Sequence, residues 1–511
     1  MRSPGFHPGA ARDSMRTAGK AMKILFASSE AHPLVKTGGL ADVSGALPRT
    51  LRNLGEDIRL VLPAYRSLLE RVPNPVPVAR LTLGGGQTVR LLRTLLPGTR
   101  VTTYLVDHPP AFDRPGNPYL GPDGQDWPDN ADRFALFARV LVELARDRCG
   151  LDWQPDLVHC NDWQTGLVPA LLSLEPDRPA TLFTIHNLAY QGLFDGATLG
   201  RLGLPPEWWS MHALEFHGRL SFIKGGLVFA DWLSTVSPTY ADEICSPEFG
   251  FGLDGLLASR RDRLSGILNG ADYDQWNPGR DPLLPQHYNR RSLAGKAACK
   301  AALQRRFGLD VRPDRPLFGH IGRLVEQKGI DLILAAVPQL LERQVQLVVL
   351  GSGEARFEAA LRQLQAATPG QVGVEVAYDE ALAHLIEAGC DGFLMPSRFE
   401  PCGLNQIYSL RYGTVPVVHA VGGLADTVVD ASPTALREQR ATGFQFHGAS
   451  LANLVQAIDR ALQAWARPDL WRQLVTTGMR QDFSWKRSAG RYAELYRTLT
   501  TPEAVAERRH G

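Results

Sequence analysis

The stretch MKILFASSEAHPLVKTGGLADV, Met22 to Val43, combines the two signals that decide the fold. It begins with a short apolar run of the kind that forms a buried strand, and it ends in a glycine-rich turn. Similar runs alternate with longer amphipathic stretches along the chain: IRLVLPAY, LVHCND, TLFTIHN, WLSTVS, PLFGHIGRL, VQLVVLGSG, GFLMPS and VPVVHA. Alternating strand and helix signals predict an α/β fold with doubly wound parallel sheets.

These runs are too many for one sheet, so we expect two Rossmann-like domains. The break falls near SGILNGADYDQWNPGRDPLL, where a strand ends at Asn269-Gly270 and a Pro- and Asp-rich stretch precedes a helix expected around residues 295–307. The domains are therefore expected at residues 22–268 and 269–480, facing a central cleft. Residues 1–21, rich in Pro, Gly and Arg, predict a disordered extension, and residues 501–511 predict a flexible tail.

Composition favours a globular enzyme and excludes several other classes. The 511 residues suggest two or three domains, and 44% hydrophobic with 21% charged residues excludes disorder of the whole chain. A net charge of +2 provides no global field that would attract nucleic acid or an anionic membrane. No apolar run approaches the roughly 18 residues of a membrane helix. We expect neither nucleic acid nor membrane as a partner.

The six cysteines are scattered without a C-x-x-C pair or metal-like spacing. This arrangement suits free thiols in a reducing compartment better than a disulfide framework, so a cytoplasmic location is expected.

The pentapeptide GGLAD occurs twice, at residues 38–42 and 422–426. The first copy follows the opening strand of the first domain, and the second follows VPVVHA late in the second domain. In doubly wound sheets, ligands bind beyond the carboxyl ends of the strands, where glycine-rich turns let backbone amides approach an anion. We expect the two copies to face each other across the cleft, with chance repetition as the alternative.

Seven blocks in a fixed order resemble one known family. The blocks are SSEAHPLVKTGGLADV, FDRPGNPY, FTIHNLAYQG, LNGAD, IGRLVEQKG, PSRFEPCGLNQIYSLRYGTVPVV and GGLADTV. They resemble the bacterial glycogen synthases and plant starch synthases, retaining glucosyltransferases of the GT-B fold. The resemblance implies transfer of glucose from ADP-glucose to the non-reducing end of an α-1,4-glucan such as glycogen, with no cofactor and no metal. FSWKRSAGRYAELYRTL resembles the family helix that crosses back to the first domain, here residues 481–500.

The resemblance assigns the catalytic roles to five residues. Lys36, Arg323 and Lys328 are implied to contact the donor diphosphate, where Arg supplies a planar fork and Lys a compact charge. Glu400, in SRFEPCGL, is implied to lie against the donor sugar, and His186, in TIHN, close to the transferring glucose. Taken singly, these residues also fit a surface lysine, structural salt bridges, a helix-capping acid and a buried structural histidine.

The remaining implied contacts divide between donor and acceptor. Tyr378 matches the position that stacks on adenine, although a core tyrosine is an equally good interpretation, and Cys402 has no paired base that would make it a nucleophile. The other implied donor contacts are Gly39, Asn269, Cys402, Gly403, Leu404 and Thr427, and the implied acceptor contacts are Glu30, Tyr119 and Asp162.

Two positions depart from related sequences. Many GT-B transferases have a second Glu eight positions after the first, where this chain has Tyr408, as expected for the synthases; Asn405 stands where bacterial relatives have Thr. With Glu400 as the one persuasive cleft carboxylate, same-face attack is favoured over a covalent intermediate. A glucan phosphorylase and a non-catalytic glycan-binding protein are the competing functions, the second suggested by ten tryptophans that could stack on sugars.

Overall fold

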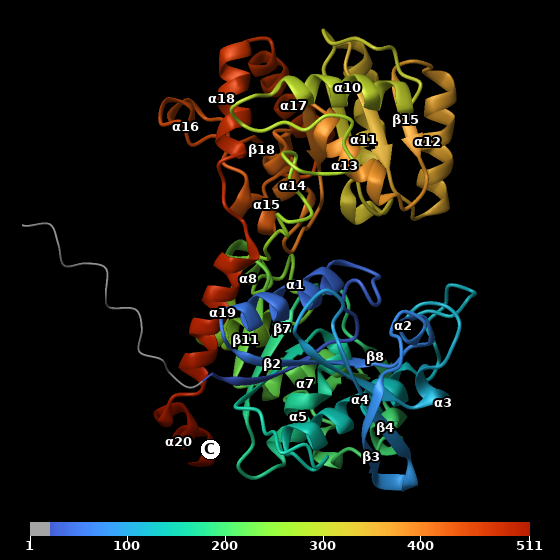
Figure 1. Cartoon of the computed structure of the whole chain (residues 1–511), viewed down its shortest axis with the longest axis vertical. Helices are drawn as coiled ribbons and strands as arrows, with labels where there is room; N and C mark the ends of the chain where they lie inside the picture. The colour runs from blue at the N-terminus through green and yellow to red at the C-terminus, as the bar shows by residue number, and fades with distance from the viewer. Residues whose placement is uncertain (1–20, 511) are drawn as a thin grey trace, which may run out of the picture.

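The computed structural model describes residues 21–510 as two α/β lobes, one above the other in Figure 1. The first lobe is built on a nine-stranded sheet and the second on a six-stranded sheet. All nine apolar runs form strands in these sheets, which confirms the predicted α/β class with two Rossmann-like lobes. Residues 1–20, most of the expected disordered extension, lie outside the described residues.

The sheet of the first lobe is parallel over most of its width. Its strands in spatial order are β12 (Leu264–Gly266), β11 (Trp232–Thr235), β7 (Ala180–Ile185), β6 (Leu157–Asn161), β1 (Lys23–Ala27), β2 (Asp57–Pro63), β5 (Thr102–Asp107), β4 (Thr88–Leu95) and β3 (Val76–Thr82). The last two form an antiparallel hairpin that the apolar runs do not predict, because most of its side chains are at least partly exposed. A small antiparallel sheet contains β8 (Leu193–Asp195), β10 (Arg219–Ser221) and β9 (Glu215–Phe216).

The helices of the first lobe lie between these strands in sequence and cover the sheet. They are α1 (Gly39–Asn53), α2 (Arg66–Leu69), α3 (Pro109–Phe112), α4 (Asn130–Ala145), α5 (Leu167–Ser173), α6 (Ala197–Arg201), α7 (Phe222–Phe229), α8 (Pro238–Glu243) and α9 (Asp254–Ser259).

The sheet of the second lobe is parallel throughout. Its spatial order is β15 (Val372–Glu375), β14 (Gln346–Leu350), β13 (Leu317–Ile321), β16 (Gly392–Met395), β17 (Val415–His419) and β18 (Phe444–Phe446). Its helices are α10 (Ala294–Arg306), close to the helix predicted at 295–307, α11 (Ile330–Glu342), α12 (Ala355–Ala367), α13 (Glu380–Gly389), α14 (Asn405–Tyr412), α15 (Gly422–Thr427), α16 (Pro433–Arg437), α17 (Leu451–Trp465) and α18 (Pro468–Gly478).

The chain then returns to the first lobe as α19 (Trp485–Leu499), the red helix beside the lower lobe in Figure 1. Its buried face joins the core of the first lobe, and the Tyr496 hydroxyl lies 2.7 Å from Nδ1 of His159 on β6. Within the stretch predicted as a flexible tail, Pro502–His510 form a further helix, α20. Within residues 21–510, no helix has the length and apolar character needed to span a membrane.

Candidate active site

A cavity of about 1630 Å³ opens between the lobes, at the carboxyl ends of strands from both sheets. Thr427 is the one predicted site residue that does not line it: its side chain is buried in α15, and its hydroxyl donates to the Gly423 carbonyl at 2.5 Å. All other predicted site residues line the cavity: Glu30, Lys36, Gly39, Tyr119, Asp162, His186, Asn269, Arg323, Lys328, Tyr378, Glu400, Cys402, Gly403 and Leu404.

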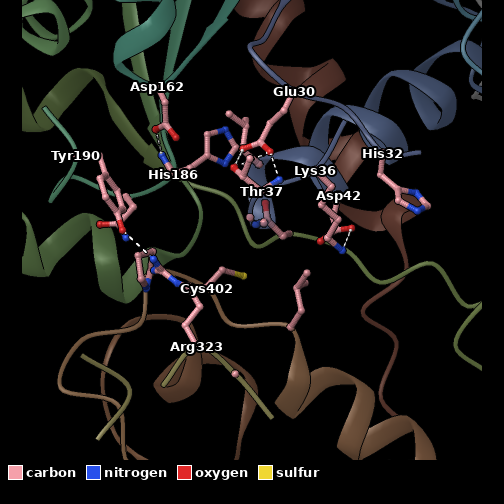
Figure 2. Close-up of a pocket in the computed structure, with 18 of the residues that line it drawn as sticks. Glu30, His32, Lys36, Thr37, Asp42, Asp162, His186, Tyr190, Arg323 and Cys402 are labelled. Atoms are coloured by element: carbon pink, nitrogen blue, oxygen red, sulfur yellow. Dashed lines mark hydrogen bonds and ion pairs between the residues drawn. The ribbon is translucent and has the colours of Figure 1, made fainter. Parts of the chain in front are cut away.

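Lys36 lies on the wall formed by the first lobe, in the loop before α1 (Figure 2). Its ammonium forms an ion pair with Asp42 at 2.8 Å, one turn into the helix. Burial lowers the pKa of Lys36, but the charge and hydrogen bond of Asp42, helped by Tyr378 and Glu380 of the second lobe, raise it above its usual value. Lys36 therefore stays charged and faces the opposite lobe.

Lys328 and Glu400 form an ion pair on the wall of the second lobe, with Nζ and Oε2 2.5 Å apart. The two loops come together because Gly329, at φ +70°, follows Lys328; a Cβ atom there would lie only 2.2 Å from the Pro396 carbonyl oxygen. Ser397 also donates to Glu400 Oε2 at 3.1 Å. A carboxylate that is 95% buried is thus held by two donors and faces the cavity.

Arg323, in the loop after β13, reaches across the cavity to the first lobe. Its Nη1 donates a hydrogen bond to the Tyr190 hydroxyl at 2.9 Å, as Figure 2 shows. Both side chains are exposed to the cavity rather than packed in a core. This contact joins residues 133 positions apart, which the sequence motifs do not predict.

Glu30, at the end of the segment that follows β1, binds the loop that carries Lys36. Its Oε2 accepts the Thr37 amide at 2.5 Å, and the Thr37 and Tyr119 hydroxyls donate to Oε1 at 3.0 and 3.2 Å. Burial raises the pKa of Glu30, although these hydrogen bonds oppose the shift. Glu30, which the sequence predicts as an acceptor contact, therefore holds the Lys36 loop in place together with Tyr119.

Asp162 and His186 come together at the ends of neighbouring strands β6 and β7. Asp162 Oδ1 accepts the His186 backbone amide at 2.7 Å, while His186 Nε2 lies 2.9 Å from Asn161 Oδ1. Burial lowers the pKa of His186 to about 3 and raises that of Asp162 to about 7. The backbone of Asp162, at φ +58° and ψ 179°, occupies a region that only glycine adopts easily, a strain of about 1–3 kcal/mol of the kind found at functional sites.

The prediction that the two GGLAD copies face each other across the cleft is wrong. The first copy lines the cavity, whereas no residue of the second does. The second copy forms α15, which packs against α8 of the first lobe. The Asp426 carboxylate accepts the Thr239 amide and hydroxyl at 2.9 and 2.7 Å, and Glu243 Oε1 accepts the Gly422 amide at 2.9 Å. This copy therefore joins the lobes outside the cavity.

Two family models match the chain. Residues 23–259 match the starch synthase catalytic domain, and residues 304–474 match the glycosyl transferases group 1. A glycogen synthase of Methylococcus capsulatus is 57% identical over 93% of this chain and 96% of its own length, and one of Thioalkalivibrio sulfidiphilus is 56% identical over 94% and 100%. The chain belongs to the glycogen and starch synthase family. It is a glycosyltransferase.

A solved structure of this family supports the same architecture. The catalytic domain of starch synthase IV from Arabidopsis thaliana, bound to ADP and acarbose, superposes with a TM-score of 0.85 at 33% identity, covering 94% of this chain and all of that one. This match confirms the GT-B fold, with the cavity between two Rossmann-like lobes.

The two positions that depart from the expected pattern have defined contacts here. The Asn405 amide donates to the Ile321 carbonyl at the end of β13 at 2.7 Å, so part of its donor capacity is already used. Tyr408, where other GT-B transferases carry a second Glu, stacks on Trp276 with ring centroids 3.9 Å apart. Trp276 stacks in turn on His384 at 3.7 Å. The aromatic stack attaches the segment between the lobes to α13 and α14.

Three further lining residues differ in how they meet the cavity. Cys402 is buried, and burial raises its thiol pKa to about 12, which argues against a thiolate nucleophile. Asn269 is 93% buried, and its Oδ1 has no hydrogen-bond partner among the described residues. Tyr378 is 75% exposed, so a face of its ring is open to the cavity. The structure thus shows a free acceptor and a free aromatic surface.

The sequence motifs miss the residues that hold the site in place. Thr37 binds Glu30, Asn161 binds His186, and Tyr190 binds Arg323. Thr37 and Asn161 are close in sequence to predicted residues, so their proximity was a usable signal. Tyr190 lies in the family block FTIHNLAYQG, but its partner is in the other lobe.

Proposed function

We propose that this glycosyltransferase transfers glucose from ADP-glucose to the non-reducing end of an α-1,4-glucan, with retention of configuration. The observation that carries the proposal is the set of cations Lys36, Arg323 and Lys328, which line one cavity from both lobes beside the buried carboxylate Glu400. A family relative with ADP and acarbose bound, and relatives named glycogen synthase, support this donor and acceptor class.

The diphosphate fits the cationic part of the cavity. Arg323 presents a planar fork, and Lys36 and Lys328 present compact charges. The first amides of α1, a 15-residue helix that begins at Gly39, add the positive end of a helix dipole. A Cβ atom added at Gly38 or Gly39 would have no other atom within 4 Å, so the space beside this backbone is open and phosphate oxygens can approach it closely. Lys328 would exchange part of its contact with Glu400 for the phosphate.

The glucose and the base of the donor fit the neutral parts of the wall. Asn269 offers its free Oδ1 to a sugar hydroxyl, and the Glu400 carboxylate accepts others. His186 is neutral at physiological pH, because its pKa is about 3, so it acts through hydrogen bonding rather than charge. The exposed ring of Tyr378 provides a stacking surface for adenine.

The acceptor fits the first lobe. Glu30, Tyr119 and Asp162 line that side of the cavity together with Trp163, an arrangement of polar groups and aromatic surface suited to a glucan. Glu30 and Asp162 each bind a backbone amide of their own lobe, Thr37 and His186 respectively. We infer that these two carboxylates have positioning roles and that Glu400, on the opposite wall, is the carboxylate that faces the donor sugar.

We infer same-face transfer from this arrangement. The bond between C1 of glucose and the β-phosphate oxygen breaks, and a bond forms between C1 and O4 of the glucan terminus. The proton of that O4 hydroxyl passes to an oxygen of the leaving diphosphate. The three cations stabilise the negative charge that grows on this leaving group, a type of stabilisation worth about 10²–10³ in rate per contact.

The test is incubation with glycogen and with ADP-glucose or UDP-glucose, each labelled in the glucose. We expect label from ADP-glucose to enter glycogen with release of ADP, and β-amylase to release the label as maltose. Elongation from UDP-glucose alone would contradict the proposed donor. Binding of glycogen without elongation would instead favour a glycan-binding protein, and elongation from glucose 1-phosphate with release of phosphate would favour a phosphorylase. The cytoplasmic location stays a prediction, supported by six cysteines that are all free.

A further inference from the structure

Of the three cations on the cavity wall, Arg323 differs from the others in its partner. Lys36 is paired with Asp42 and Lys328 with Glu400, so the charge of each lysine is partly compensated. Among the residues that the structure describes, Arg323 has no carboxylate partner, and its hydrogen bond goes to the neutral hydroxyl of Tyr190. Its positive charge is therefore available to a ligand.

The Tyr190 contact orients Arg323 without using up its donors. A guanidinium carries five N–H donors, and the hydroxyl occupies only one, at Nη1. The remaining donors keep the planar fork that binds two phosphate oxygens at once. Because Arg323 is otherwise exposed, this single hydrogen bond restricts a side chain that has considerable rotamer freedom.

The hydrogen bond between Tyr190 and Arg323 is one of several contacts between the two lobes at this edge of the cavity. The rings of Phe251, from the first lobe, and Phe399, from the second, pack edge to face with centroids 5.4 Å apart. Gln191, the neighbour of Tyr190, donates to the Phe251 carbonyl at 3.1 Å. Phe399 directly precedes Glu400. The distance between Tyr190 and Arg323 is thus set together with the position of the Glu400 loop.

We propose that Tyr190 is a positioning residue for Arg323: from the opposite lobe, it orients the guanidinium toward the leaving diphosphate. The inference rests on the proposed function, in which Arg323 binds that diphosphate. It predicts that Arg323 acts at full strength only when the lobes are close enough for the hydroxyl to reach it. Binding of ADP alone, which Lys328 also supports, depends less on Tyr190.

The test compares Tyr190→Phe with Arg323→Ala and with the double variant. Hydrogen bonds to charged groups contribute about 1.5–3 kcal/mol, so Tyr190→Phe should lower kcat for glucose incorporation from ADP-glucose by about 10-fold or more. The Kd for ADP in the absence of glucan should change less than about twofold. In the Arg323→Ala background Tyr190→Phe should have no further effect on kcat, because the guanidinium that the hydroxyl orients is already absent. The three variants and the wild type form a double-mutant cycle that isolates this pair.

Tyr104→Phe is the matched control. Tyr104 also accepts a hydrogen bond from a guanidinium, that of Arg59 at 2.5 Å, but it lies in the sheet and does not line the cavity. This variant should keep the wild-type kcat. A wild-type kcat for Tyr190→Phe would overturn the inference. An equal loss of kcat from this substitution in the Arg323→Ala background would also overturn it. A gain in both ADP affinity and kcat would show instead that Tyr190 competes with the diphosphate for Arg323.

The two proposals fail in different ways. If Arg323→Ala itself kept the wild-type rate, the diphosphate role of Arg323 would be wrong, and the inference about Tyr190 would be wrong with it. If Arg323→Ala lost activity strongly while Tyr190→Phe did not, the proposed function would stand and only the positioning role would be rejected.

Discussion

The two GGLAD copies show how one pentapeptide serves opposite structural needs. At Gly38 and Gly39 an added Cβ would meet no atom within 4 Å, because the glycines face the open cavity. At Gly422 and Gly423 an added Cβ would lie 2.0 Å from the Glu400 and Cys402 carbonyl oxygens, respectively. The first pair leaves space for a ligand, and the second pair leaves space for the neighbouring backbone.

The aspartates of the two copies differ in the same way. Asp42 pairs with Lys36 on the cavity wall, whereas Asp426 accepts two hydrogen bonds from Thr239 in the other lobe. The first copy therefore lines the cavity, and the second supports the Glu400 loop while joining the lobes. Substitutions at equivalent positions should then have different consequences.

The largest difference is expected between the glycines. In Gly423→Ala the new methyl group meets a backbone carbonyl that cannot move without shifting the Glu400 loop, and we expect activity to fall by more than about 100-fold. Overpacking of this kind costs about 1–3 kcal/mol or more, so the melting temperature should fall by at least about 2–6 °C. Calorimetry and incorporation assays measure both effects.

Gly39→Ala is the matched substitution in the first copy. Since nothing surrounds this position, the variant should melt within about 1 °C of the wild type, whatever its effect on donor binding. Equal losses of stability in the two alanine variants would show that the packing difference between the copies has no energetic consequence.

The next largest effect separates the two lysines. Lys36→Ala should lose about 100-fold in kcat yet keep most ADP binding, because in the proposed function Lys36 of the first lobe reaches a diphosphate that the second lobe holds. Lys328→Ala should weaken ADP binding outright, since it also leaves the buried Glu400 carboxylate without its cation. Titration calorimetry with ADP and steady-state kinetics distinguish these outcomes.

Solution scattering extends this comparison. With ADP and a glucan oligomer, the radius of gyration of the wild type should decrease as the two lobes approach each other, and that of Lys36→Ala should not. An equal decrease in Lys36→Ala, or an equal loss of ADP affinity in both lysine variants, would show that the loop of the first copy does not bring the lobes together.

The sequence predicts what depends on continuous local signals. All nine predicted apolar runs form strands, although the buried strand β5 is not among them. Of the 15 predicted site residues, 14 line the cavity, because most of them lie in loops that follow strands, and doubly wound sheets bring these loops together. The β3–β4 hairpin is missed because its pattern is half exposed. Whether a glycine faces a cavity or a neighbouring carbonyl depends on tertiary contacts. The motifs GGLAD and GGLADTV therefore could not predict that the second copy and Thr427 lie outside the cavity.

A smaller effect is expected at the contact between the lobes. Asp426→Ala removes two hydrogen bonds to Thr239, which contribute about 0.5–1.5 kcal/mol each. The melting temperature should fall by about 2–6 °C, while kcat should stay within about threefold, because the contact lies outside the cavity. Thr239→Val should reproduce part of this loss by removing only the hydroxyl. A loss of kcat as large as that of Lys36→Ala would show that the second copy also contributes to catalysis.

The smallest effect concerns the pH dependence of the same contact. Glu243 accepts the Gly422 amide with one oxygen, and its other oxygen is buried without a partner among the described residues. Burial raises the pKa of Glu243 to about 7, and the charges of Asp426, Glu248 and Asp242 add to the shift. The folded protein therefore binds a proton at this site more tightly than the unfolded chain, whose ordinary value is 4.5.

The sign of the effect follows from proton linkage. Between about pH 4.5 and pH 7 the folded state holds more protons at Glu243 than the unfolded state, so this group makes stability fall as the pH rises through that window. Glu243→Gln keeps an acceptor for the Gly422 amide but cannot titrate. Its melting temperature should therefore decline less between pH 5 and pH 8 than that of the wild type, by about 1–2 °C. Glu207→Gln, at an exposed position, should decline like the wild type. If Glu243→Gln and the wild type declined in parallel, the Glu243 carboxylate would be ionised throughout this range, and the contact between α8 and α15 would carry the charges of both Glu243 and Asp426.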